Sequence, residues 1–293
     1  MMHVKTREIY DSFGKSYYSP KHRTIRYFNA IQTFPIRIAF SEQAMFLKKS
    51  LEELDILNIG VGNGQHCEQL CLPTFDIVFG ERARWDKITD YDISPAMLAA
   101  AKRYYPSKEW QTKTGEREPK QITGDALEIS DYLPPESFDI VLAGLCDHIE
   151  DQEKMYAEVL KVLKPDGIFI TTYPHKKLMT TIRRDLYGID PSFTRFKINE
   201  QDCLVPSYIP EPKDIEKLLN ITGFNVVEAE SLQHDSNFDH HNGNISNTIR
   251  HAQEKIGKSL EEIPILVFAI GRKPNGLSTW ERKEKEDPWF WYN

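Results

Sequence analysis

Three glycines at alternate positions, Gly60, Gly62 and Gly64, follow the short apolar segment Asp55–Ile59. Glycine accepts positive φ and lets a ligand approach the backbone, and a helix continuing through Gln65–Leu70 would offer unpaired N–H groups. This spacing predicts a strand–turn–helix cradle for a nucleotide-like ligand. The alternative is a tight turn that uses the glycines only for itself, and the spacing is G-x-G-x-G, not the G-x-G-x-x-G of dinucleotide enzymes.

An acidic residue, Asp92, closes a second expected strand within Thr89–Ala101. Ser94 can cap the helix that follows, and Pro95 fits the first turn of that helix. In open α/β sheets, an acid at the end of the second strand holds a ribose diol. The glycine turn and Asp92 together predict a nucleoside site.

A histidine, His148, comes just after the continuous apolar run Phe138–Ala143, which is typical of a central parallel strand. Residues past the carboxyl ends of such strands form the ligand crevice. Because histidine titrates near neutral pH, His148 is our candidate for a general base that takes a proton from an amine, hydroxyl or carbon. Alternatively it only packs beside Asp147 and Glu150.

Five motifs occur in one order along the chain, and together they resemble the class I S-adenosylmethionine-dependent methyltransferases, in particular the broad small-molecule type. They are NIGVGNG (58–64), YDISPAML (91–98), ITGDALE (Ile122–Glu128), FDIVLAGLCDHIED (Phe138–Asp151) and VLKVLKPDGIFITTYP (Val159–Pro174).

The resemblance implies S-adenosylmethionine as cofactor and S-adenosylhomocysteine as product. It implies that Asp92 holds the ribose, that Ile93 or Met97 packs on the adenine, and that Asp125 with Ala126 binds the adenine edge. For Asp125 the alternative is a turn cap. The full set expected to bind cofactor is Gly60, Gly62, Gly64, Asn58, Asp92, Ile93, Met97, Asp125, Ala126, Leu145 and Tyr10.

One position departs from the family pattern. The family carries an acid two residues before the first glycine, which helps to hold the ammonium end of the cofactor, and here that residue is Asn58. Asparagine accepts a hydrogen bond but adds no charge.

The first fifty residues are expected to be helical, over Arg7–Tyr18, Lys21–Gln32 and about Ser41–Leu51. Aromatic residues that include Tyr10 and Tyr17 recur every three or four positions, so they share one face. That face either packs on the core or, as in the Y-D-x-x-x-x-x-Y opening of related enzymes, belongs to a lid over the site that excludes water. Tyr17 is the second catalytic candidate after His148.

The resemblance implies an α/β, Rossmann-like, doubly wound fold with a seven-stranded, mostly parallel sheet and an antiparallel last strand. The later strands are expected at Ile168–Thr172, Asn225–Glu230 and Pro264–Gly271. The expected divisions are a helical lid region at 1–50, a methyltransferase domain at 51–273 with insertions at 175–208 and 231–262, and an aromatic tail at 274–293.

The two insertions and the tail are not expected to form part of the core sheet. Lys176–Arg184 is a cationic helix candidate that either covers the active site and selects the acceptor or is simply solvated. His234–Asn244 holds three histidines and two aspartates, but such clusters in polar loops are more often solvated, and we expect no metal. The four aromatics of Asp287–Asn293 are expected to pack on this chain or on a second subunit of a homodimer.

Charge, hydropathy and cysteine content argue against several classes of protein. A net charge of −7 over 293 residues argues against a protein that coats nucleic acid. No apolar run approaches the length of a membrane span and no signal-peptide core opens the chain, so a cytoplasmic location is expected. Cysteines at 67, 71, 146 and 203 form no C-x-x-C pair and are expected to be reduced thiols.

We therefore expect methyl transfer to a nitrogen, oxygen or carbon of a small-molecule metabolite. One alternative is an RNA methyltransferase of the cap-guanine type, which the segment Lys164–Arg184 resembles in part. Nucleic acid is thus disfavoured but not excluded as a substrate. The other alternative is a cofactor-binding subunit without catalytic activity.

Overall fold

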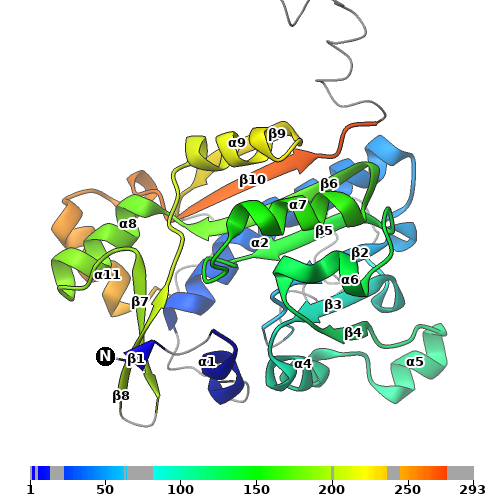
Figure 1. Cartoon of the computed structure of the whole chain (residues 1–293), viewed down its shortest axis with the longest axis horizontal. Helices are drawn as coiled ribbons and strands as arrows, with labels where there is room; N and C mark the ends of the chain where they lie inside the picture. Colours follow the sequence, from blue (N-terminus) through cyan, green and yellow to red (C-terminus); the bar gives the residue numbers. More distant parts are fainter. Residues whose placement is uncertain are drawn as a thin grey trace, which may run out of the picture.

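A seven-stranded sheet forms the centre of the protein, with the strand order β4-β3-β2-β5-β6-β10-β9 (Figure 1). The computed structural model describes residues 2–3, 6–13, 23–62, 64, 71, 82–198, 201–235 and 245–275. β10 is antiparallel to both neighbours, and the pairs from β4 to β6 are parallel. The strands are β2 (Ile56–Ile59), β3 (Ile88–Asp92), β4 (Lys120–Thr123), β5 (Phe138–Gly144), β6 (Leu163–Pro174), β9 (Asn225–Leu232) and β10 (Leu266–Arg272). The predicted fold class is confirmed.

Helices cover both faces of this sheet. α2 lies behind it in the view of Figure 1, and α7 and α9 lie in front. The helices are α1 (Thr6–Phe13), α2 (Arg23–Leu47), α4 (Pro95–Ala101), α5 (Lys108–Thr114), α6 (Ile129–Tyr132), α7 (Gln152–Val162), α8 (Lys176–Thr180), α9 (Pro212–Ile221) and α11 (Asn247–Ile256). Short helical turns occur at Leu51–Glu53, Trp85–Lys87, Lys102–Tyr104, Ala126–Glu128, Thr181–Leu186 and Leu260–Glu262.

Burial explains the sequence pattern of the central strand. β5 is paired with β2 and β6 and is covered on both faces, so Phe138–Ala143 is buried throughout. This is why polar and apolar residues do not alternate there.

Helix α2 corrects one prediction. We expected separate helical stretches at Lys21–Gln32 and Ser41–Leu51, but one helix of 25 residues continues through Pro35. Proline removes one backbone hydrogen bond and costs about 3 kcal/mol in a helix interior. The helix continues because residues on both sides of the proline, such as Ile31 and Phe40, are buried in the same core.

The insertion at 175–208 carries a hairpin that the sequence did not indicate. β7 (Phe193–Ile198) and β8 (Gln201–Pro206) are antiparallel, and the N-terminal β1 (Met2–His3) pairs with β8 in parallel. The resulting three-stranded sheet lies beside α1 (Figure 1).

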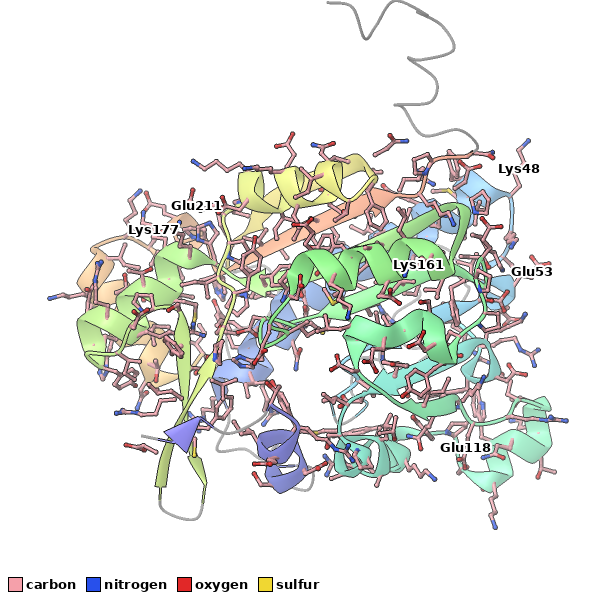
Figure 2. The ribbon with its side chains drawn as sticks, viewed as in Figure 1. Lys48, Glu53, Glu118, Lys161, Lys177 and Glu211 are labelled. Carbon is pink, nitrogen blue, oxygen red and sulfur yellow. The ribbon has the colours of Figure 1, made fainter. Side chains whose placement is uncertain are left out.

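Charged side chains such as Glu53, Lys161 and Lys177 project outward (Figure 2). Asp139 is buried instead, and it accepts hydrogen bonds from Lys49 at 2.7 Å and Lys164 at 2.8 Å at the amino ends of the parallel strands. Among the described residues, no helix combines the length and apolar character needed to cross a membrane.

Candidate active site

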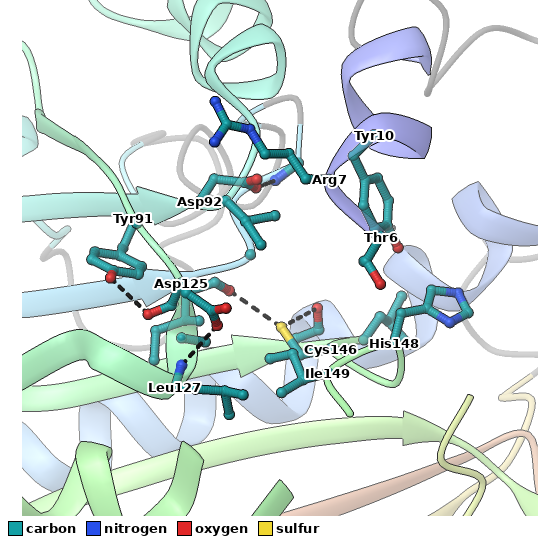
Figure 3. A pocket seen from close by; sticks show the side chains of 18 of the residues that line it. Thr6, Arg7, Tyr10, Tyr91, Asp92, Asp125, Leu127, Cys146, His148 and Ile149 are labelled. Carbon is teal, nitrogen blue, oxygen red and sulfur yellow. Dashed lines mark hydrogen bonds between the residues drawn. The ribbon is translucent and has the colours of Figure 1, made fainter. Parts of the chain in front are cut away.

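A cavity of about 420 Å³ lies beyond the carboxyl ends of β2, β3, β4 and β5. This is the edge of an open parallel sheet at which ligands bind. Helix α1 contributes Thr6, Arg7 and Tyr10 to the opposite wall of the cavity (Figure 3).

The glycine turn forms part of the cavity wall. Gly60 and Gly62 have φ values of +64° and +56° and line the cavity, whereas Gly64, with φ of +87°, does not. A Cβ added to Gly60 would lie 2.6 Å from Sγ of Cys146, and one added to Gly64 would lie 2.7 Å from Cβ of Ala101. Two of the glycines are therefore required by both conformation and space. The expected helix at Gln65–Leu70 lies outside the described residues.

The carboxylate of Asp92 is fixed by two backbone donors. Its Oδ2 accepts from the Gly62 N–H at 3.1 Å, and its Oδ1 accepts from the Ser94 N–H at 2.8 Å. Burial, together with the charges of Asp90 and Asp11, raises the pKa of Asp92 to about 7 although the two backbone hydrogen bonds oppose this rise. Asp92 lines the cavity beside the glycine turn, as predicted.

The predicted helix cap is confirmed. Ser94 Oγ accepts from the Met97 N–H at 3.2 Å, and Pro95 opens α4. The same hydroxyl donates to Oδ1 of Asp11 at 2.6 Å, which joins α1 to the start of α4. Met97 is fully buried and is not among the residues that line the cavity, whereas Ile93 lines it.

Asn58 is buried in β2 and is not part of the cavity wall. Its Nδ2 donates to Oδ1 of Asp90 at 3.0 Å, and the hydroxyl of Tyr105 donates to the other oxygen of Asp90. An acid at position 58 would place a second buried carboxylate beside Asp90, and the two negative charges would repel each other. Asp90, the hydrogen-bond partner of Asn58, thus explains the departure from the family pattern at position 58. The sequence did not indicate this partner, although Asp90 lies two residues before Asp92 on the same strand.

Asp125 caps a turn and also lies on the cavity wall. Its Oδ1 accepts from the Leu127 N–H at 2.9 Å, so it caps the turn Ala126–Glu128. Asp125 and Ala126 also line the cavity, and the carbonyl oxygen of Asp125 accepts from the Tyr91 hydroxyl at 2.8 Å (Figure 3).

Leu145 follows β5 in a left-handed conformation with φ of +57°. This conformation is unfavourable for leucine, and it is held by the Leu145 N–H, which donates to the Thr172 carbonyl at 3.0 Å. Leu145 and Tyr10 line the cavity, as expected. Tyr17 lies outside the described residues.

His148 lines the cavity with 9% of its surface exposed. Its Nδ1 lies 3.0 Å from the Pro206 carbonyl oxygen, and Nε2 lies 3.7 Å from Oδ2 of Asp147. A carbonyl only accepts, so Nδ1 carries a hydrogen and the neutral ring keeps its lone pair on Nε2. The ring centroids of Tyr10 and Phe196 lie 6.2 Å and 5.4 Å from that of His148.

A buried polar network connects this loop to the insertion. The Ser207 hydroxyl donates to Oδ2 of Asp147, and Arg183 donates to Ser207 Oγ at 3.0 Å. Arg183 also donates to Thr194 at 2.7 Å and to the Pro191 carbonyl at 2.6 Å. Burial lowers the pKa of Arg183, and Asp147 opposes this shift. The alternative of a simply solvated cationic helix is therefore wrong for Arg183.

Several cavity residues carried no recognisable signal in the sequence. They are Thr6, Arg7, Asn29 and Glu150. Asn29 comes from α2, where its Oδ1 accepts from Gln32 Nε2 at 2.7 Å. No group of histidine, cysteine and carboxylate side chains suited to a metal ion occurs in the part of the chain that the structure describes.

The model of a methyltransferase domain family matches residues 57–171, which contain the glycine turn, Asp92, Asp125 and His148. This match identifies residues 57–171 as a methyltransferase domain. No curated protein sequence matches the methyltransferase.

Solved structures share the fold of the methyltransferase at low identity. A putative methyltransferase from Haloferax volcanii, in complex with the Trm112 methyltransferase activator, is 15% identical with a TM-score of 0.54, over 90% of this chain and 97% of that one. A putative S-adenosylmethionine-dependent methyltransferase from Listeria monocytogenes is 18% identical with a TM-score of 0.51, over 80% and 98%. A putative sarcosine dimethylglycine methyltransferase from Galdieria sulphuraria is 16% identical with a TM-score of 0.51, over 83% and 87%.

The cavity suits S-adenosylmethionine as a cofactor. Gly60 leaves open a space that any side chain would fill beside Cys146. Asp92 supplies a buried carboxylate to the same cavity, an acceptor that suits ribose hydroxyls.

Proposed function

We propose that the methyltransferase acts on a small-molecule acceptor that binds between Tyr10 and His148. The observation that supports this most directly is the continuity of one cavity from the glycine turn and Asp92 to His148, with α1 over it. A volume of about 420 Å³ is at the low end of pockets that hold one small ligand. Little space remains beside a bound cofactor, which favours a small acceptor.

In this proposal the cofactor is held by residues of three strand ends. Gly60 and Gly62 leave room for its methionine part, Asp92 accepts from its ribose hydroxyls, and Asp125 with Ala126 contacts the adenine edge. When bound, S-adenosylmethionine supplies an electrophilic methyl group on a sulfonium. Ile93, which lines the cavity, packs on the adenine of the cofactor.

His148 serves as the base for the acceptor. Because Nδ1–H is held by the Pro206 carbonyl, Nε2 is the atom that receives the acceptor proton. The carboxylate of Asp147, 3.7 Å from Nε2, stabilises the positive ring that results. The acceptor is a nitrogen, oxygen or carbon atom that becomes a better nucleophile as its proton leaves.

Helix α1 serves as a lid. It brings Tyr10 and Arg7 to the cavity and is joined to α4 through the hydrogen bond from Ser94 to Asp11. A closed lid excludes water and holds the acceptor in line with the methyl group.

The test is methyl uptake from tritiated S-adenosylmethionine, with metabolite extract and total RNA from one culture offered separately. We expect label in the small-metabolite fraction that is lost in the Asp92→Asn variant. The Glu216→Lys variant, altered on the exposed face of α9, is the matched control and should retain full uptake. Label in RNA alone, with none in metabolites, would contradict the proposal.

A further inference from the structure

Helix α2 presents apolar side chains to solvent on the face opposite the core. Ile38, Met45 and Phe46, which we call the α2 patch, are 41%, 58% and 54% exposed. At seven and eight positions apart, Ile38 lies on the same side of the helix as the other two. Clustered apolar exposure of this kind marks a surface that another segment covers.

The described chain ends beside the α2 patch. The Arg272 guanidinium lies 3.9 Å from the ring centroid of Phe46 and donates to Gln43 Oε1 at 2.8 Å. Asn275 donates to Oδ2 of Asp166 at 2.7 Å, and the carbonyl of Asp166 accepts from Gln43 Nε2 at 2.9 Å. The end of β10 and the C-terminal end of α2 accordingly meet at the upper right of Figure 1.

The sequence that follows complements this surface. Residues 276–293 read GLSTWERKEKEDPWFWYN, and their large apolar side chains are Trp280 and the aromatic run 289–292. Eight residues of helix separate Ile38 from Phe46, a length of about 12 Å. If residues 276–293 are extended, they reach roughly 55 Å. The segment is therefore long enough to cover the α2 patch from its attachment at the end of β10.

We propose that residues 276–293 dock on the α2 patch of their own chain, with their aromatic rings on Ile38, Met45 and Phe46. This inference is independent of the acceptor, because the patch lies on the outer face of α2 and none of its residues lines the cavity. It explains why a strongly aromatic segment follows a strand that ends beside a helix with exposed apolar residues.

The test places a photoreactive amino acid at position 45 of the full-length protein. Equal amounts of normal and nitrogen-15 chains are mixed before irradiation, and cross-linked peptides are identified by mass spectrometry. We expect cross-links from position 45 to peptides within 276–293 that carry one isotope only. Mixed-isotope pairs would assign the patch to a second copy and overturn the proposal, as would the absence of tail peptides from the products.

A matched position completes the test. The same amino acid at position 221, where Ile221 is 58% exposed on the other side of the sheet, should give no tail cross-link. Equal yields of tail cross-links from positions 45 and 221 would overturn the proposal.

Discussion

The Nδ1 atom of His148 lies 3.0 Å from the carbonyl oxygen of Pro206, a residue 58 positions further along the chain. Pro206 ends β8, so the inserted hairpin sets the tautomer of the ring in the cavity. Nε2 is thereby left as the atom that can accept a proton. The insertion acts on the site through this contact and through the network of Asp147, Ser207 and Arg183.

Replacing His148 tests its role as base. His148→Ala should lower kcat by about 10²–10⁴ and leave cofactor affinity nearly intact. If the ring only positions substrate, His148→Gln should keep most activity. Normal turnover in the alanine variant would remove His148 from the reaction, and thermal melts of each variant separate this from a loss of stability.

Cofactor affinity should depend on pH through Asp92. Burial raises the pKa of this carboxyl to about 7, so below that pH the carboxyl is mostly protonated. It must then lose its proton before it can accept hydrogen bonds from both ribose hydroxyls. We expect the dissociation constant for S-adenosylhomocysteine to rise up to about tenfold per pH unit below 7. Asp92→Asn should bind about 1–3 kcal/mol more weakly at pH 8 with no such dependence. Calorimetry that gives the same pH profile for both proteins would refute the assignment.

The same carboxyl affects the stability of the ligand-free protein. Its pKa is raised by burial to about 7, so the folded state holds the proton more tightly than the unfolded chain does. Between about pH 4 and pH 7 the stability that Asp92 contributes should therefore fall as the pH rises. Asp92→Asn should remove that part of the pH dependence. Urea titrations across this window, compared between the two proteins, measure it.

Asn58→Asp tests why this chain lacks the family's acid. The new carboxylate would meet Asp90, which now accepts from the Asn58 amide at 3.0 Å. We expect a loss of about 1–3 kcal/mol in the free energy of unfolding at neutral pH, shrinking in acid as one carboxyl takes up a proton. Asn220→Asp, at an exposed position of α9, should change it by less than about 0.5 kcal/mol. Equal stability of the two variants would show that the amide is not needed.

The lid proposal is tested at the contact between α1 and α4. Asp11→Ala removes the acceptor of the Ser94 hydroxyl, so KM for the acceptor should rise several-fold with little change in cofactor affinity. Glu8→Ala, exposed on the same helix, is the control and should behave as wild type. Deleting Met1–Tyr18 should leave a folded sheet without turnover. Full activity of that truncated protein would exclude a lid.

Local sequence signals were sufficient for the sheet and for half of the site. Short apolar runs ending at Gly60, Asp92 and Gly144 predicted the strands, and the polar residues after those runs predicted where the cavity lies. These features depend on neighbours in sequence, so they can be read without knowing the tertiary structure.

The missed features depend on contacts between distant segments. The hydrogen-bond partner of Asn58 is Asp90. The hydrogen-bond partner of His148 is Pro206, in a hairpin that no local sequence pattern predicted. Helix α2 continues through Pro35 because of the core beneath it, which outweighs local propensity. Asn29 lines the cavity from α2, and no local pattern marks it among the other residues of that helix.

The most direct test of the account is a structure of the protein with S-adenosylhomocysteine bound. The account predicts the ribose hydroxyls within hydrogen-bonding distance of Asp92, the adenine edge at Asp125, and the sulfur facing the space between Tyr10 and Nε2 of His148. A bound cofactor whose ribose lies away from Asp92, or whose sulfur faces away from His148, would contradict it.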